Sequence, residues 1–136
     1  MKIRTLVPIS WGGEEMPLIS RAEIAVFEKR VQLPMVLLIL ERDREWVKKS
    51  PFKLKAPYVE LLDRAIEQAR GDLAETIEWM RANGMKVRRG SKDGNFSEYV
   101  FCHGGYEDHR RYLNIRLKNA VEDQLRFYLT AAAKAF

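Results

Sequence analysis

The stretch that decides the fold spans residues 33–40 and reads LPMVLLIL, the only run in the sequence without a charged or strongly polar side chain. In a helix, apolar side chains on all sides of the axis predict burial on all sides. The run is far shorter than the roughly 20 residues that a membrane span needs, and the charged residues 41–44 follow directly. We therefore expect it to form the centre of the core, with the other elements packed around it.

The helix that contains this run has a well-marked beginning. Ser20 followed by Glu23 is a capping-box pattern, in which each side chain accepts a hydrogen bond from a backbone N–H group of the first turn. The helical pattern continues to about residue 49. Pro34 interrupts it, because proline inside a helix removes a hydrogen bond and clashes with the preceding turn, at a cost of about 3 kcal/mol. We expect a kink or a break near Leu33.

A second helix and a hairpin are predicted next. The helix runs from Pro57 to a cap at Asn83 and Gly84, and Gly71 is a point where it could instead divide into two shorter helices. Strands are predicted over 85–89 and 96–103, because aromatic and branched residues there flank a turn that contains Asp-Gly. The sequence therefore indicates a β-hairpin at about residues 85–103.

The predicted fold class is mainly α (α+β): an antiparallel helical bundle of three to four helices with a β-hairpin inserted before the C-terminal helix. That last helix is expected to begin between residues 106 and 114 and to run to about residue 133. Replacing Leu38 by Ala is predicted to cost about 2 to 5 kcal/mol. The predicted core consists of Ile24, Phe27, Leu38, Leu62, Ile66, Leu73, Ile77, Val100, Leu117, Val121 and Leu125.

Residues 16–136 are predicted to form a single helical domain, and residues 1–15 a disordered or non-native extension. The extension ends in Gly-Gly-Glu-Glu, whose codons form a purine-rich tract that can hold a bacterial ribosome-binding sequence just before the Met16 codon. Met16 would then be the native start. The alternative, a native N-terminal tail, stays open, because chain termini are often poorly ordered.

The composition favours a cytoplasmic protein. A chain of 136 residues with 46% apolar residues can bury one core, and its single cysteine rules out an internal disulfide. The net charge of +5 is compatible with nucleic acid, an acidic protein or an anionic membrane surface, and it selects none of them. Because we find no spanning segment and no signal peptide, we expect no membrane partner.

The densest group of metal-ligand side chains comprises Cys102, His103 and His109. Zinc sites usually combine two pairs of such residues, and here the second pair is missing. Strand alternation also directs Cys102 and His103 to opposite faces of a sheet. We expect no metal and no cofactor, and the absence of a nucleophile elbow or a phosphate-binding glycine loop favours a protein that is not an enzyme.

Two kinds of binding surface are predicted. The hairpin resembles the wing of a winged-helix regulator, with Arg88, Arg89 and Lys92, together with Lys53, as candidate contacts to nucleic acid. The helix before it carries Asp72, Glu75 and Glu78, which would repel a phosphate backbone.

The second surface is a homodimer contact. Two further helices and a hairpin are not expected to cover the apolar run on every side, so a second copy could complete its burial. Met35, Leu37 and Leu40 are the candidate residues for this self-association.

Three segments carry a resemblance to known proteins: residues 31–37 (VQLPMVL), 49–55 (KSPFKLK) and 105–107 (GYE). Together they resemble the YhjD-like group of small proteins from Bacillus-type bacteria, over roughly residues 24–130. The resemblance implies a helical cytosolic protein without an assigned activity and transfers no catalytic residue. We predict a non-enzymatic protein-interaction or regulatory module that self-associates; the alternative is a nucleic-acid-binding regulator.

Overall fold

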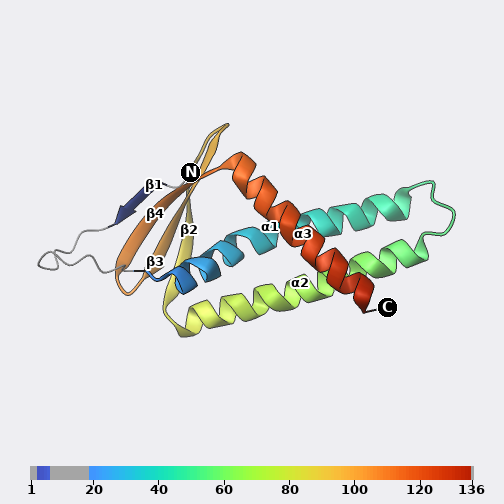
Figure 1. Ribbon diagram of the computed structural model, residues 1–136, viewed down its shortest axis with the longest axis horizontal. Helices are drawn as coiled ribbons and strands as arrows, with labels where there is room; N and C mark the ends of the chain where they lie inside the picture. Colours follow the sequence, from blue (N-terminus) through green and yellow to red (C-terminus); the bar gives the residue numbers. More distant parts are fainter. Residues whose placement is uncertain (1–2, 7–18, 136) are drawn as a thin grey trace, which may run out of the picture.

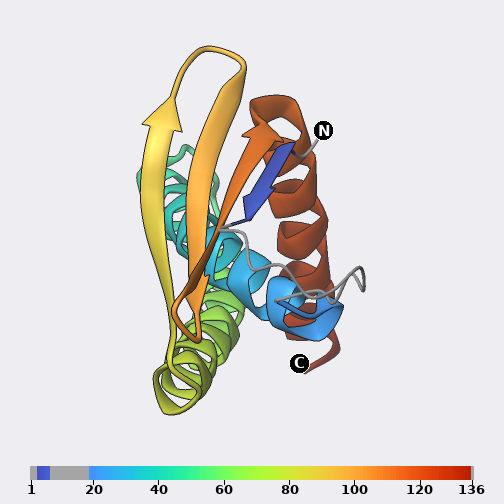
Figure 2. The same cartoon turned by 90° about the vertical axis from the view of Figure 1, so that its left-hand side faces the viewer.

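The computed structural model describes residues 3–6 and 19–135, which form one sheet and three helices on one side of it (Figures 1 and 2). The sheet has the strand order β1-β4-β3-β2, and every neighbouring pair is antiparallel. In chain order the elements are β1 (Ile3–Leu6), α1 (Arg21–Lys49), α2 (Ala56–Ala82), β2 (Met85–Lys92), β3 (Phe96–His103), β4 (Tyr106–Leu113) and α3 (Asn114–Lys134).

The predicted helical bundle is wrong, because the hairpin is part of a larger antiparallel sheet. The hairpin itself is confirmed as β2 and β3, and β4 continues from β3 through a turn at Gly104 and Gly105, both with positive φ. Strand β4 was not predicted, because five of its eight residues, YEDHRRYL, are acidic, basic or histidine. Its inward positions include Asp108 and Arg110, which satisfy each other inside the protein, so no apolar alternation marks the strand.

Helix α1 begins as predicted. The Glu23 backbone N–H donates to Ser20 Oγ at 3.2 Å, and the Ser20 N–H donates to Glu23 Oε1 at 3.0 Å. The helix does not break at Pro34 but continues as one element to Lys49. Leu33 and Val36, on either side of the proline, are fully buried, and burying two such side chains contributes about 3 to 6 kcal/mol, enough to offset the cost of the proline. Helix α2 likewise runs undivided through Gly71.

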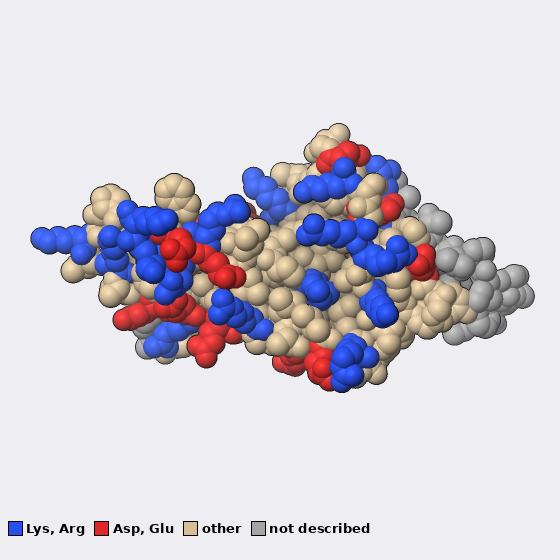
Figure 3. Space-filling model, turned by 180° about the vertical axis from the view of Figure 1, so that it is seen from behind, with Lys and Arg blue, Asp and Glu red and all other residues tan. Residues whose placement is uncertain are grey.

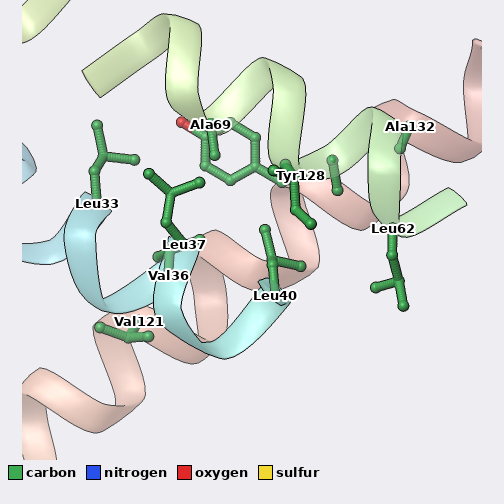
Figure 4. Packing of buried hydrophobic residues seen from close by; sticks show 11 residues of the cluster. Leu33, Val36, Leu37, Leu40, Leu62, Ala69, Val121, Tyr128 and Ala132 are labelled. Atoms are coloured by element: carbon green, nitrogen blue, oxygen red, sulfur yellow. The ribbon is translucent and has the colours of Figure 1, made fainter. Parts of the chain in front are cut away.

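Two apolar clusters form the core. The first lies where α1 packs between α2 and α3 (Figure 4), and it includes Leu33, Val36, Leu37 and Leu40 of the central run. The second joins α1 to the sheet and the start of α3, and it contains the stacked rings of Phe27 and Phe101, 4.6 Å apart. The central run is therefore the core of one copy of the chain.

Most of the predicted core residues are inside, but two are not. Leu38 is 56% exposed and Ile77 is 43% exposed, so both predictions are wrong. The buried side of α1 follows residues 33, 36, 37 and 40, and the buried side of α2 turns from Ala69 to Thr76 and Met80. Of the others, Phe27, Leu62, Ile66, Val100, Leu117 and Val121 are buried, while Ile24, Leu73 and Leu125 are partly buried.

Part of the N-terminal prediction falls on residues that the structure does not describe. Residues 3–6 form β1 and pair with residues 108–111 of β4. Met16 and the Gly-Gly-Glu-Glu segment lie outside the described residues, so the start at Met16 stays a prediction. In the part of the chain that the structure describes, no helix combines the length and apolar character required to cross a membrane.

Candidate binding groove

The candidate metal ligands do not converge. Cys102 and His103 lie on opposite faces of β3, as alternation predicts. His103 Nδ1 lies 2.6 Å from Glu23 Oε2 of α1, whereas His109 Nε2 lies 3.3 Å from Glu107 Oε1 on the other face. Among residues 3–6 and 19–135, no three His, Cys, Asp or Glu side chains are grouped as a metal site requires.

The candidate nucleic-acid contacts do not form one basic surface. Arg88 lies on the face of the sheet opposite the helices, where its guanidinium contacts Glu107 at 2.5 Å. This ion pair raises the pKa of Arg88 and lowers the pKa of Glu107. Arg89 lies on the opposite face of β2, and Lys53 lies in the connector between α1 and α2, beyond the far ends of those helices. Lys92 lies near Arg89, so the four residues are distributed over three separate places: Arg88, the pair Arg89 and Lys92, and Lys53.

The candidate self-association residues are largely internal. Leu40 is 1% exposed and Leu37 is 8% exposed, and both pack in the first core cluster. Met35 is partly buried and contacts both clusters. Within one chain, α2 and α3 bury Leu33, Val36, Leu37 and Leu40 of the central run, while Leu38 is exposed.

An open groove lies between the helical layer and the end of the β2–β3 hairpin. Its volume is about 650 Å³, and α1, the β2–β3 hairpin and α3 form its walls. This volume lies within the range of ligand-binding sites, about 300 to 1,000 Å³. Its surface is mainly apolar, and the apolar side chains come from three elements: Met35, Ile39, Tyr99, Leu117, Val121 and Leu125.

Two helices each supply a row of these side chains. Met35 and Ile39 are four residues apart on α1, and Leu117, Val121 and Leu125 repeat every four residues on α3. Residues with this spacing lie on one face of a helix, and eight residues of rise correspond to about 12 Å. The groove is therefore an apolar trough about two helical turns long.

Cations line the rim of the trough. Arg89, Lys92 and Lys118 all contribute to its wall, and none of them is paired with a carboxylate among the described residues. Two acidic residues also reach the groove: Glu98, and Glu122, which contacts Arg126 at 4.0 Å. Burial raises the pKa of Tyr99 in the wall, and the charge of Arg89 opposes that shift. Cationic groups thus remain available to an anionic partner.

A β-bulge places Lys92 at the groove. Arg89 pairs with Tyr99, and Lys92 pairs with Ser97, so β2 contains one residue more than β3 in this interval. In a regular ladder, Ser91 would lie opposite Ser97. Because of the extra residue, Lys92 takes that position, and Arg89 and Lys92 both lie on the face that the helices cover.

Hydrogen bonds hold the hairpin end against α3. Ser97 Oγ donates to Asn114 Oδ1 at 2.7 Å, and Asn114 Nδ2 donates to the Asp93 carbonyl at 3.0 Å. The Asp93 carboxylate accepts backbone N–H groups of the turn, which lowers the pKa of Asp93. The wall formed by β2, β3 and the start of α3 is therefore preorganised.

The sequence analysis named Arg89, Lys92 and Met35 but did not place them in one site, and it did not single out Lys118. The signal for the α3 wall was present as the four-residue repeat of Leu117, Val121 and Leu125, which was assigned to the core. Only Leu117 and Val121 are buried, and Leu125 is partly exposed. Periodicity shows that a helix has an apolar side, but not that a neighbour covers all of it.

Comparisons with known proteins agree with the resemblance predicted from the sequence. A family model described as "YhjD protein" matches residues 18–133. A curated relative from Bacillus subtilis (strain 168), "Uncharacterized protein YhjD", is 33% identical over 116 residues, which cover 85% of this chain and 97% of the relative. No solved structure matches the chain.

Proposed function

This chain belongs to the YhjD family, and we propose that it is a non-enzymatic protein-interaction module whose groove binds an acidic amphipathic helix of a partner protein. The observation that carries this proposal is the apolar trough with three cations that lack acidic partners among the described residues. The family match itself assigns no activity.

The shape of the trough supports a helix as its occupant. Helices bind in grooves by inserting apolar side chains at positions i, i+3, i+4 and i+7 between two ridges of the host. Here α1 and α3 supply the ridges, and the hairpin closes one end. The groove is open to solvent, which suits a segment of a larger molecule better than an enclosed metabolite.

The charge of the rim supports an acidic partner. Carboxylates that flank the apolar stripe of a partner helix would lie near Arg89, Lys92 and Lys118. Such pairs at a rim contribute mainly to the rate of association and to the choice of partner, while the apolar stripe supplies most of the affinity.

The proposal is tested with a synthetic peptide. The probe is a labelled helix of about 18 residues with leucines at i, i+3, i+4 and i+7 and glutamates on both flanks, since a shorter helix is marginal in water. The matched peptide carries lysine at every glutamate position. We expect the full chain to bind the acidic peptide in fluorescence anisotropy and to bind the basic one at least tenfold more weakly, a difference of about 1.4 kcal/mol.

Charge reversal on the protein provides the control. Lys92→Glu with Lys118→Glu should weaken binding of the acidic peptide and strengthen binding of the basic peptide. Lys86→Glu, at an exposed lysine on the other face of the sheet, should leave both affinities unchanged. The proposal fails if the chain binds neither peptide, if it binds both equally, or if a small amphipathic anion such as decanoate binds while the peptides do not.

The alternative of a nucleic-acid-binding regulator has less support. Arg88 is paired with Glu107, Arg89 and Lys92 lie at the groove, and Lys53 is at another end of the molecule. One phosphate backbone would therefore not meet all four groups on a single surface. Its test is salt dependence, because affinity that rests on phosphate contacts must fall as salt rises.

Self-association through the central run stays a prediction. The apolar residues that motivated it are buried inside one copy, apart from Leu38 and the partly buried Met35 and Ile39. Light scattering at high protein concentration measures the oligomeric state, and a monomer mass would rule out the homodimer.

A further inference from the structure

The turn between α1 and α2 exposes apolar side chains that the proposed interaction function does not use. Residues 46–58, which we term the α1–α2 tip, include Trp46, Phe52, Leu54 and Tyr58, which are 71%, 50%, 75% and 53% exposed, respectively. Phe52 and Tyr58 contact each other with ring centroids 5.4 Å apart. Large apolar groups gathered at one exposed end of a molecule are typical of an interaction site.

The same segment is strongly basic. It contains Lys48, Lys49, Lys53 and Lys55 and no acidic residue. The flanking acids include Glu45, Glu60 and Asp63. Glu45 and Asp63 both contact Arg44, so the charge of these two is offset locally, and Glu60 is an exposed carboxylate close to the segment without an ion pair among the described residues. Figure 3 shows many Lys and Arg side chains, with several Asp and Glu side chains beside them, at the left-hand end of the molecule, where the connector between α1 and α2 of Figure 1 lies.

The tip is an ordered structure. Ser50 Oγ donates to the Val47 carbonyl at 2.6 Å, and Lys55 Nζ donates to the Lys48 carbonyl at 3.0 Å at the end of α1. The Tyr58 and Val59 N–H groups both donate to the Lys55 carbonyl, which starts α2. The exposed rings and Leu54 are therefore held outward by backbone geometry.

We infer that the α1–α2 tip docks on the surface of an anionic lipid bilayer. Lysines near an anionic membrane gain electrostatic attraction, Trp and Tyr favour the headgroup region, and Phe and Leu gain by entering the acyl boundary. A nucleic acid would use the lysines and could stack on the rings, but it offers no apolar environment for Leu54, the most exposed of the four. The sequence-based expectation of no membrane partner rested on the lack of a spanning segment, which surface docking does not need.

The test uses the full chain and vesicles of phosphatidylcholine with about 30% phosphatidylserine, compared with vesicles of phosphatidylcholine alone. We expect co-sedimentation with the anionic vesicles only, weakened by salt. Lys49→Ala with Lys53→Ala should reduce the partition coefficient about 25-fold, at about fivefold per lysine. The matched control, Lys29→Ala with Lys86→Ala, removes two exposed lysines elsewhere and should leave it unchanged.

Tryptophan emission identifies the face that meets the lipid. In a Trp11→Phe, Trp79→Phe background, Trp46 is the remaining tryptophan. Its emission maximum should move to shorter wavelength on vesicle binding, and brominated lipids should quench its fluorescence. In a Trp11→Phe, Trp46→Phe background, Trp79, near the other end of α2, should not respond. The inference is overturned if the chain partitions equally into both vesicle types or if the two double lysine variants change the partition coefficient equally. It is also overturned if the emission of Trp46 does not change on vesicle binding, or if the chain binds single-stranded oligouridylate more tightly than anionic vesicles.

Discussion

At the scale of single residues, the inward face of β4 depends on one buried ion pair. Arg110 Nε lies 3.0 Å from Asp108 Oδ2, and the two side chains are 4% and 0% exposed. The guanidinium also lies 5.7 Å from the centre of the Phe101 ring, in cation–π geometry. Two charges can occupy the interior of the sheet because each compensates the other.

Removing the cation of this pair should therefore be severe. We expect Arg110→Met to lower the free energy of unfolding by about 3 to 5 kcal/mol, because it leaves the Asp108 carboxylate buried without its guanidinium. Urea denaturation followed by circular dichroism measures the change. Arg88→Met, which breaks the exposed pair with Glu107 on the other face, is the matched control and should have almost no effect. Equal losses in the two variants would contradict the assigned burial.

At the scale of the element, the apolar run in α1 has a buried side and an exposed side. Leu33, Val36, Leu37 and Leu40 face α2 and α3 (Figure 4), whereas Leu38 is exposed. Successive residues of a helix are rotated by about 100°, so neighbours within one apolar run face different surroundings.

Two leucines of this run should thus respond differently to truncation. We expect Leu40→Ala to cost about 2 to 5 kcal/mol, because the side chain is fully buried and a cavity would remain. Leu38→Ala should leave the denaturation midpoint nearly unchanged, which corrects the cost predicted from the sequence. A large loss at Leu38 would indicate that this side chain is covered in solution, as the proposed homodimer would require.

At the scale of the whole molecule, α1 joins the two core clusters. Its first half packs on the sheet and its second half packs on α2 and α3, and Met35 contacts both clusters. Side chains also connect the elements: Tyr112 donates to Glu28 at 2.9 Å, and Tyr128 donates to Asp72 at 2.6 Å. The helices and the sheet are thereby linked into one structure.

This linkage predicts a single cooperative unfolding transition. Far-ultraviolet circular dichroism follows mainly the helices, whereas the near-ultraviolet signal follows the packed aromatic residues, which include Phe27, Tyr99, Phe101 and Tyr112 of the sheet cluster. We expect the two signals to give the same midpoint in urea. Separate midpoints would show that the sheet and the helical layer unfold independently.

Some features of the candidate sites could be predicted from local sequence patterns, and others depend on how the helices and strands pack together. Strand alternation predicted that Cys102 and His103 diverge, and they do. The groove could not be predicted, because its walls come from residues 35–39, 89–99 and 114–125, which are brought together only by packing. The sequence predicted a basic connector at the α1–α2 tip. The exposure of Trp46 and Leu54 could not be predicted, because it depends on where the two helices end.

The sequence by itself determined the local features: the capping box at Ser20, the three helices, the β2–β3 hairpin and the membership in the YhjD family. These follow from periodicity, caps and turn residues, which act within a few positions along the chain. Tertiary structure alone decided that β1 and β4 extend the hairpin, that α1 continues through Pro34, and that Leu38 faces outward. The physical reason is that burial of residues far apart in the sequence, such as Phe27 against Phe101, outweighs local preference and leaves no short-range signal.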